Sequence, residues 1–246
     1  AISHYAVEAA ILKVYGSEML DYVIDEAVQI HGGMGYSAEM DVERGYRDSR
    51  INRIFEGTNE INRLLVIDTT LKRAMKGDFD LFGEAEKLYT QIGTVAEPAR
   101  SGETYFEEKK RYLKNFKKIA LLIIHAATRH FEKKFAQEQE IMNNLANILM
   151  DIYVAESTCL RVEKLETLKG SEAIALYRDI LDVFVNDAAA RIKKEALDAI
   201  WSFATGEQAE KLSQAALQLT EVAGVNVKEA RRRIADKLIA ENQYKF

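Results

Sequence analysis

Apolar residues recur every three or four positions along most of this chain, which is the spacing of one face of an α-helix. One such pattern covers residues 2–30 and another covers residues 61–75. A glycine cluster at 32–35 is expected to end the first helix, because glycine tolerates the left-handed backbone values found at helix C-termini. Residues 40–46 should form one or two helical turns, and Thr58 is expected to cap the helix that follows.

Five further amphipathic patterns follow and predict an antiparallel helical bundle. They cover residues 104–136, 141–170, 171–206, 207–222 and 227–242. Ser171 and Asn226 are the expected N-caps of the third and the fifth of these helices. The fold class predicted from the patterns is all-α.

Two segments that interrupt the helical pattern divide the chain. They are residues 76–81 and residues 94–103, and the second contains the only proline, Pro98. The boundary between two helical domains should lie between them. The predicted regions are a helical region over residues 1–76, a linker with a short helix over 77–103, and a helical bundle over 104–246.

The composition favours a helical protein of a reducing compartment. One proline among 246 residues argues against most β-rich folds, whose turns use proline and glycine. A single cysteine, Cys159, excludes an intrachain disulfide and a multi-thiolate metal site. The net charge of −5 lacks the basic excess that dominates nucleic-acid affinity, so no nucleic-acid partner is expected. No apolar run approaches the ~20 residues that span a bilayer.

Residues 29–63 contain the motifs that carry chemistry. A Gln-Ile-His-Gly-Gly-Met-Gly-Tyr segment spans residues 29–36, an Arg-Asp pair stands at 47–48, and Glu-Gly-Thr-Asn-Glu-Ile spans residues 56–61. In this order and at this distance the motifs resemble the C-terminal helical domain of the flavin-dependent acyl-CoA dehydrogenases, although either motif alone would be a weak signal. The resemblance implies the end of that helical bundle, followed by a second antiparallel helical bundle.

In that family a carboxylate removes the α-proton of an acyl-CoA thioester while a hydride leaves the β-carbon for the flavin. The resemblance implies that Glu56 is this catalytic base, that its backbone N–H helps to polarise the thioester carbonyl, and that Gly57 lets the substrate approach closely. Such a base should face an apolar slot, because burial destabilises the charged form of a carboxylate. Outside the motif, Glu56 would be an ordinary exposed acid beside a helix N-terminus.

The resemblance also implies FAD as the cofactor. Thr58, Asn59 and Glu60 stand at a helix N-terminus, where N–H groups and the helix dipole suit an anionic dinucleotide. In the family the glycine-rich loop commonly contacts the adenosine end of an FAD that is bound mainly by a neighbouring subunit. The residues expected to make this contact are Gln29, Ile30, His31, Gly32 and Gly33. Many relatives carry glutamine where this chain has Glu60, and simple helix capping would account for both segments if the resemblance failed.

Glutamate at position 56 and the long helical region after residue 76 favour the very-long-chain branch of the family. That branch implies a fatty acyl-CoA substrate in β-oxidation, an electron-transfer flavoprotein as acceptor, and a homodimer or higher homo-oligomer. The expected location is the cytoplasm or, in a eukaryote, the mitochondrial matrix or inner-membrane surface. Two alternatives remain open: an acyl-CoA oxidase, and a non-enzymatic helical scaffold or membrane-docking module.

The chain begins with Ala1 inside a helical pattern, without a capping residue before it, which predicts a piece of a longer protein. The family's N-terminal helices and β-domain, which hold most of the flavin ring and the acyl slot, are missing from these residues. We therefore expect the isolated 246 residues to bind little FAD and to be inactive.

Several weaker candidates favour structural explanations. His125 and His130 lie five positions apart, a poor pairing for one helix face, and the acids near Asp78 lack the spacing of a calcium loop, so no metal site is predicted. Cys159 falls on an apolar helix face and should pack in the core. The basic run at 231–233 precedes apolar residues; it favours a solvated helix face over a peripheral membrane contact.

Overall fold

The computed structural model describes residues 2–244 and 246, and no strand occurs among them, which confirms the all-α prediction for this part of the chain. The α-helices are α1 (Ala6–His31), α2 (Asp41–Ile51), α3 (Asn59–Met75), α4 (Leu81–Thr90), α5 (Tyr105–Phe131), α6 (Gln139–Lys169), α7 (Ala175–Phe203), α8 (Gly206–Leu219) and α9 (Val227–Glu241). Short 3-10 helices are η1 (Ile2–Tyr5), η2 (Gly32–Tyr36), η3 (Ile92–Thr94), η4 (Glu132–Gln137) and η5 (Glu172–Ile174).

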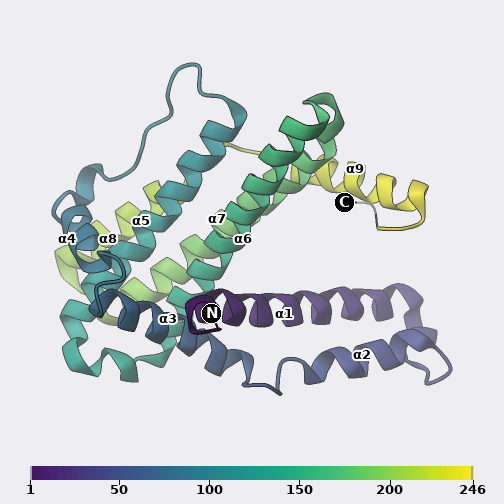
Figure 1. Ribbon diagram of the computed structural model, residues 1–246, viewed down its shortest axis with the longest axis horizontal. Coiled ribbons are helices and arrows are strands. Elements are labelled where there is room, and N and C mark those ends of the chain that lie inside the picture. The colour runs from purple at the N-terminus through teal and green to yellow at the C-terminus, as the bar shows by residue number, and fades with distance from the viewer. Residues whose placement is uncertain (1, 245) are drawn as a thin grey trace. The chain divides into compact units, whose positions relative to one another are not determined.

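The chain divides into two compact units. Among the described residues, unit 1 comprises those up to Asp80 together with 138–146, which include the first turns of α6, and unit 2 comprises 81–137 and those after 146. Within unit 1, α1 packs against both α2 and α3, and Figure 1 shows α1 and α2 running side by side in opposite directions. The glycine-rich segment η2 and the turn before α3 both belong to this unit.

Unit 1 is built on one buried face of α1. This face carries Ala10, Ile11, Val14 and Ser17, which follow the spacing of the helical repeat. Gly32 ends α1 with a positive φ of 60°, as the glycine cluster predicts. The helix α2 extends to Ile51 and is therefore longer than the segment expected at 40–46. Acids in its first turn and Arg50 in its last turn suit the helix dipole, a charge pattern that hydrophobic spacing does not show.

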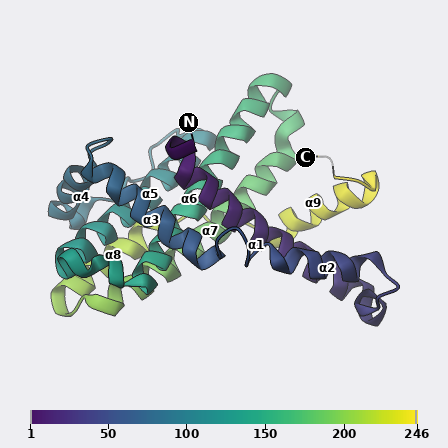
Figure 2. The same ribbon diagram turned by 60° about the horizontal axis from the view of Figure 1, so that its bottom comes forward.

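Unit 2 is a helical bundle whose core lies among α5, α7 and α8, which Figure 2 shows grouped together. Its fully buried side chains include Phe116, Ile123, Leu181, Ile192 and Leu212.

The ends of three helices of unit 2, α9, α5 and α7, test the boundaries and caps expected from the sequence. Asn226 caps α9 as predicted, by accepting from the Glu229 N–H. The helix α5 ends at Phe131, before the expected 136, because Glu132 takes a φ of 50°. The prediction that Ser171 caps the third long helix is wrong: α7 starts at Ala175, after η5, and the Ser171 side chain makes no cap hydrogen bond.

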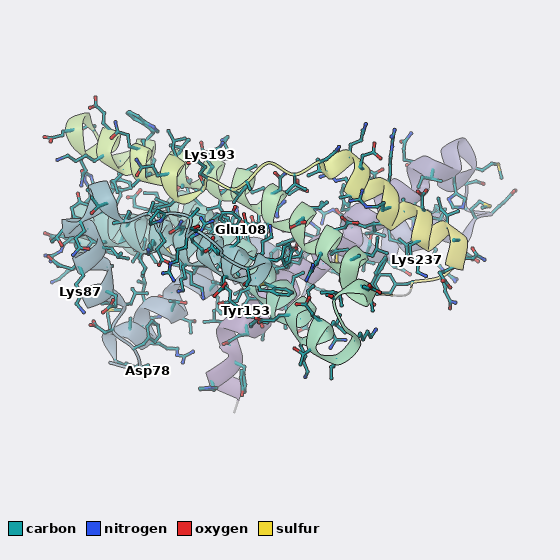
Figure 3. All side chains as sticks on the ribbon, turned by 90° about the horizontal axis from the view of Figure 1, so that it is seen from above. Asp78, Lys87, Glu108, Tyr153, Lys193 and Lys237 are labelled. Atoms are coloured by element: carbon teal, nitrogen blue, oxygen red, sulfur yellow. The ribbon has the colours of Figure 1, made fainter. Side chains whose placement is uncertain are left out.

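A buried cation joins two helices of this bundle. The side chain of Lys109 on α5 is 6% exposed, and its Nζ lies 2.8 Å from Oδ1 of Asp182 on α7. The Tyr105 hydroxyl donates to the same oxygen at 2.9 Å, and burial together with this carboxylate raises the pKa of Tyr105 well above its usual value. Figure 3 shows neighbouring Glu108 among the crowded side chains of unit 2. The Lys109–Asp182 pair therefore fixes α5 against α7.

Cys159 and the basic run at 231–233, two of the weaker candidates from the sequence, have structural roles in unit 2. Cys159 is fully buried on α6, and burial raises the pKa of its thiol to about 11. Two arginines of the basic run pair with acids of α7: Arg231 with Asp187 at 2.7 Å and Arg233 with Asp179 at 2.6 Å. Among the described residues, no three His, Cys, Asp or Glu side chains gather as metal ligands would. None of the helices described here combines the length and the apolar character that crossing a membrane requires.

We predict that Asp182→Ala destabilises the protein by about 2–3 kcal/mol, because it removes the nearer of the two carboxylates beside the buried Lys109 cation and leaves only Glu108, at 3.5 Å. The matched control is Asp198→Ala, which removes the exposed partner of Lys194 and should cost less than about 0.5 kcal/mol. Urea denaturation followed by the fluorescence of Trp201, the only tryptophan of the chain, measures both changes. Equal, small losses in the two variants would contradict the assignment.

Candidate active site

The turn between α2 and α3 presents Glu56 in an unusual backbone conformation. Glu56 has a φ of 58° and the next residue, Gly57, has a φ of 82°. Positive φ is disfavoured for a residue with a side chain, so neighbouring contacts must hold Glu56 in place. Thr58 then caps α3 as predicted, by accepting from the Ile61 N–H at 3.3 Å. The turn projects Glu56 outward, and its side chain is exposed.

Side chains from two helices hold the carbonyl of Gly57. The Nζ of Lys13 on α1 donates to this oxygen at 2.8 Å, and the Nδ2 of Asn62 on α3 donates to it at 2.8 Å. Arg53, just before the turn, pairs with Asp21 of α1 at 2.7 Å. The turn is thus fastened to α1 on both sides of Glu56.

Asn59 forms the buried centre of this arrangement, with 1% of its surface exposed. Its Oδ1 accepts from Lys13 Nζ at 2.7 Å, and its Nδ2 donates to Ser17 Oγ at 2.9 Å and to Glu18 Oε1 at 3.1 Å. Glu18 is held in turn by both terminal nitrogens of Arg63, each at 2.8 Å. The side chain of Asn59 is therefore committed to the protein's own hydrogen bonds.

The surroundings of Glu56 are apolar but open. Ile54, Phe55 and Ile61 are 49%, 48% and 57% exposed. These side chains give an apolar surface beside the carboxylate, as the expected slot requires, but they do not enclose it. The enclosure expected for a catalytic base is not supplied by the described residues of unit 1.

The N-terminus of α3 is largely satisfied within the chain. The Asn59 N–H donates to the Arg53 carbonyl at 3.1 Å, and the Ile61 N–H is taken by Thr58. Glu60 adds a negative charge, and a hydrogen bond from its own backbone N–H is the main cause that lowers the pKa of its carboxyl. This end of the helix consequently differs from the open anion site that the sequence suggested for Thr58, Asn59 and Glu60.

The glycine-rich loop offers a more open surface. Gln29, Ile30, His31, Gly32 and Gly33 are all exposed, with Ile30 at 82%. The Gly32 N–H donates to the Gln29 carbonyl, and the ring Nδ1 of His31 lies 2.8 Å from the Ala27 carbonyl oxygen, which it can reach as a donor. A Cβ on Gly32 or Gly33 would meet no atom within 4 Å, so a ligand can approach the backbone there.

A groove of about 620 Å³ lies beside this loop and against α2. Its lining includes Tyr36, Tyr46, Arg47 and Arg50, together with apolar Ile51. Tyr36 closes the glycine-rich motif but was given no contact of its own, and sequence reasoning selected neither Tyr46 nor Arg50 as a site residue. Positions 46, 47 and 50 share one face of a helix, and that spacing was the available signal. Arg47 also pairs with Glu43, one turn earlier.

The two motifs do not meet in unit 1. The turn is fastened at Lys13, whereas the loop begins at Gln29 near the other end of α1. At ~1.5 Å of rise per residue Lys13 and Gln29 lie about 24 Å apart along the helix, and Asp21, which holds Arg53 just before the turn, lies about 12 Å from Gln29. The Gly32–Gly33 backbone and the Glu56 turn therefore lie at different places along α1, although the groove beside Gly35 and Tyr36 extends to Ile54, two residues before Glu56.

Comparisons with known proteins agree with both motifs. Family models described as "Acyl-CoA dehydrogenase, C-terminal domain" match residues 2–71 and, separately, residues 115–236. A "Probable acyl-CoA dehydrogenase" of Bacillus subtilis is 41% identical over 244 residues, which cover 99% of this chain and 41% of that protein. The human mitochondrial "Very long-chain specific acyl-CoA dehydrogenase" is 35% identical over 214 residues, covering 77% of this chain and 32% of the human protein.

A solved structure extends this similarity to the fold. The acyl-CoA dehydrogenase of Bacillus anthracis, determined in complex with FAD, matches with a TM-score of 0.95 and 39% identity. The match covers 100% of this chain and 42% of that one. The chain thus spans about two fifths of the length of the Bacillus proteins it matches.

We predict that Gly35→Ala destabilises unit 1 by roughly 1–3 kcal/mol, because the new Cβ would lie 2.6 Å from the Val28 carbonyl oxygen on α1. Gly33→Ala is the matched control: it adds the same methyl group two residues away, where nothing lies within 4 Å. Thermal unfolding and hydrogen exchange of the loop measure the difference. A Gly35→Ala variant as stable as the control would refute this close packing.

Proposed function

The chain belongs to the acyl-CoA dehydrogenase family, and we propose that it forms the C-terminal part of an FAD-dependent acyl-CoA dehydrogenase. The proposed reaction is the α,β-dehydrogenation of fatty acyl-CoA thioesters. The observation that carries this proposal is the exposed Glu56, held at a φ of 58° beside the apolar Ile54 and Phe55.

Glu56 would act as the general base on the α-carbon of the thioester. Its carboxylate takes the α-proton, the electrons of that C–H bond form the new double bond, and the hydride departs from the β-carbon. FAD, when bound, supplies the acceptor for this hydride. The Glu56 backbone N–H would polarise the thioester carbonyl, and Gly57, with no side chain, would let the acyl group come close.

Apolar surroundings that exclude water from the Glu56 carboxylate would complete the catalytic site. The described residues leave Glu56 open, and the chain spans about two fifths of the Bacillus relatives it matches. We therefore propose that the remainder of the full-length protein, together with the acyl chain, covers the Ile54–Phe55 surface and excludes water from the carboxylate. Exclusion of water destabilises the charged carboxylate and strengthens it as a base.

The glycine-rich loop fits the anionic end of FAD better than the α3 N-terminus does. Gly32 and Gly33 leave the backbone accessible, and Arg47 and Arg50 line the adjacent groove. We propose that Gln29, Ile30, His31, Gly32 and Gly33 contact the adenosine end of an FAD bound mainly by a neighbouring subunit of a homodimer or higher oligomer. Gln29 and Lys13, the α1 residues beside the loop and beside the Gly57 carbonyl, lie about 24 Å apart along the helix, and this distance supports contacts with two different FAD molecules.

Thr58, Asn59 and Glu60 have a different proposed part. Because Asn59 is buried and Glu60 is charged, this segment is proposed to lie against the neutral flavin end of FAD and not against its pyrophosphate. Asn59 would act indirectly, because its side-chain hydrogen bonds with Lys13 and Ser17 hold the turn in place. No metal ion is proposed at either surface.

The proposed chain length of the substrate rests on a more distant similarity. The identity of 35% with the human very long-chain enzyme and the match of a second C-terminal model to residues 115–236 support a long-chain substrate in β-oxidation. An electron-transfer flavoprotein is the proposed acceptor. The proposed location is the cytoplasm of a bacterium, or the mitochondrial matrix side in a eukaryote.

We predict that Glu56→Gln in the full-length protein slows flavin reduction by acyl-CoA roughly 10²–10⁴-fold, because the base is lost while the shape of the side chain is kept. Anaerobic stopped-flow mixing, followed by the absorbance of oxidised flavin, measures the rate. The FAD content and the melting temperature of the variant serve as controls. A variant with unchanged flavin reduction would exclude Glu56 as the base.

The wild-type protein in the same assay separates the alternatives. Absence of any acyl-CoA-dependent flavin reduction would favour a helical scaffold, and rapid reoxidation of the reduced flavin by oxygen would favour an acyl-CoA oxidase.

We predict that Gln29→Ala weakens FAD binding about 5- to 10-fold, the effect of losing roughly one hydrogen bond, without slowing flavin reduction in the FAD-saturated enzyme. Glu26→Ala is the matched control, since Glu26 is also exposed and lies nearly one turn earlier on α1. Titration of the apo-protein with FAD measures both affinities. Equal affinities in the two variants would remove Gln29 from the cofactor contact.

A further inference from the structure

Lys13 lies beneath the Glu56 turn, on α1, and was selected by neither motif. Its Nζ donates to the Gly57 carbonyl at 2.8 Å and to Asn59 Oδ1 at 2.7 Å. Both acceptors are neutral oxygens, and one belongs to the residue directly after Glu56. We propose that Lys13 is a positioning residue that orients the Glu56 carboxylate, an inference that rests on the proposed function.

The backbone of the turn explains why an external anchor is needed. Glu56 and Gly57 both have positive φ values, 58° and 82°, and such a conformation costs a residue with a side chain of order 1–3 kcal/mol. Fixing the Gly57 carbonyl fixes the plane of the following peptide group. The backbone on one side of Glu56 is then restrained, and with it the direction in which the carboxylate leaves the turn.

Lys13 can act as a rigid anchor because its own partner is fixed. Asn59 is buried and bonded to Ser17 and Glu18, which stand on the same helix as Lys13. A cationic donor also makes stronger hydrogen bonds to these oxygens than a neutral donor would. Asn62 holds the same Gly57 carbonyl from α3, so Lys13 and Asn62 clamp it from two helices.

The test uses the full-length enzyme with Lys13→Met, which keeps an unbranched side chain of nearly the same length and removes its donors. We expect flavin reduction by acyl-CoA to slow about 10- to 100-fold, the effect of misplacing a reacting group by around 1 Å. The affinity for a non-reactive acyl-CoA analogue and the FAD content should stay within about twofold. Lys13→Arg, which restores a cationic donor, should recover most of the rate.

Lys72→Met is the matched control. Lys72 is also in unit 1, but it is exposed and pairs only one turn away with Asp68, so its loss should leave flavin reduction unchanged. If Lys13→Met fails to fold, Asn62→Ala tests the same clamp, because it removes the second donor to the Gly57 carbonyl and should slow the reaction in the same direction.

A double-mutant cycle separates positioning from a general effect on folding. In a Glu56→Gln background, Lys13→Met should cause no further loss, because no carboxylate remains to be oriented. An equal additional loss in that background, or an unchanged rate in the single variant, would overturn the role of Lys13. If Glu56→Gln alone leaves the rate unchanged, the proposed function fails; if only Lys13→Met does so, the proposed function stands and the positioning role fails.

Discussion

The buried amide of Asn59 is the interaction on which the candidate site depends. A polar side chain that is 1% exposed must satisfy its donors and acceptors within the protein, and Asn59 does so with Lys13, Ser17 and Glu18 of α1. Its position as the first residue of α3 makes it the junction between that helix and α1. The strained turn that carries Glu56 is therefore built directly onto a satisfied, buried network.

Local signals were enough to predict most of the helices. Thr58 and Asn226 cap the helices expected of them, and the glycine cluster ends α1, because caps and glycines act within one turn of chain. The errors arise where the pattern does not distinguish burial from exposure. The length predicted for the exposed helix α2 was too short. Ser171 was predicted to cap α7, but a turn of 3-10 helix lies between Ser171 and the start of α7.

The candidate site was predictable as a motif and not as a structure. The spacing of residues 29–61 carries the family resemblance, but nothing in that spacing shows that Lys13 reaches the turn, since it lies 44 residues from Gly57. The hydrogen bonds between Asn59 and α1 could not be predicted for the same reason. Contacts between distant segments depend on which helix faces pack together, and a sequence pattern gives the face of a helix without its partner.

The two surfaces of unit 1 also differ in electrostatic character, and this difference has a physical cause. At the turn, a carboxylate at Glu56 and another at Glu60 make the end of α3 unfavourable for a phosphate, while the N–H groups of Asn59 and Ile61 are already taken. At the loop, accessible glycine backbone stands near Arg47 and Arg50. The groove that Arg47 and Arg50 line reaches Ile54, two residues before Glu56, so the base has an apolar neighbour on the side of the cations that suit a pyrophosphate.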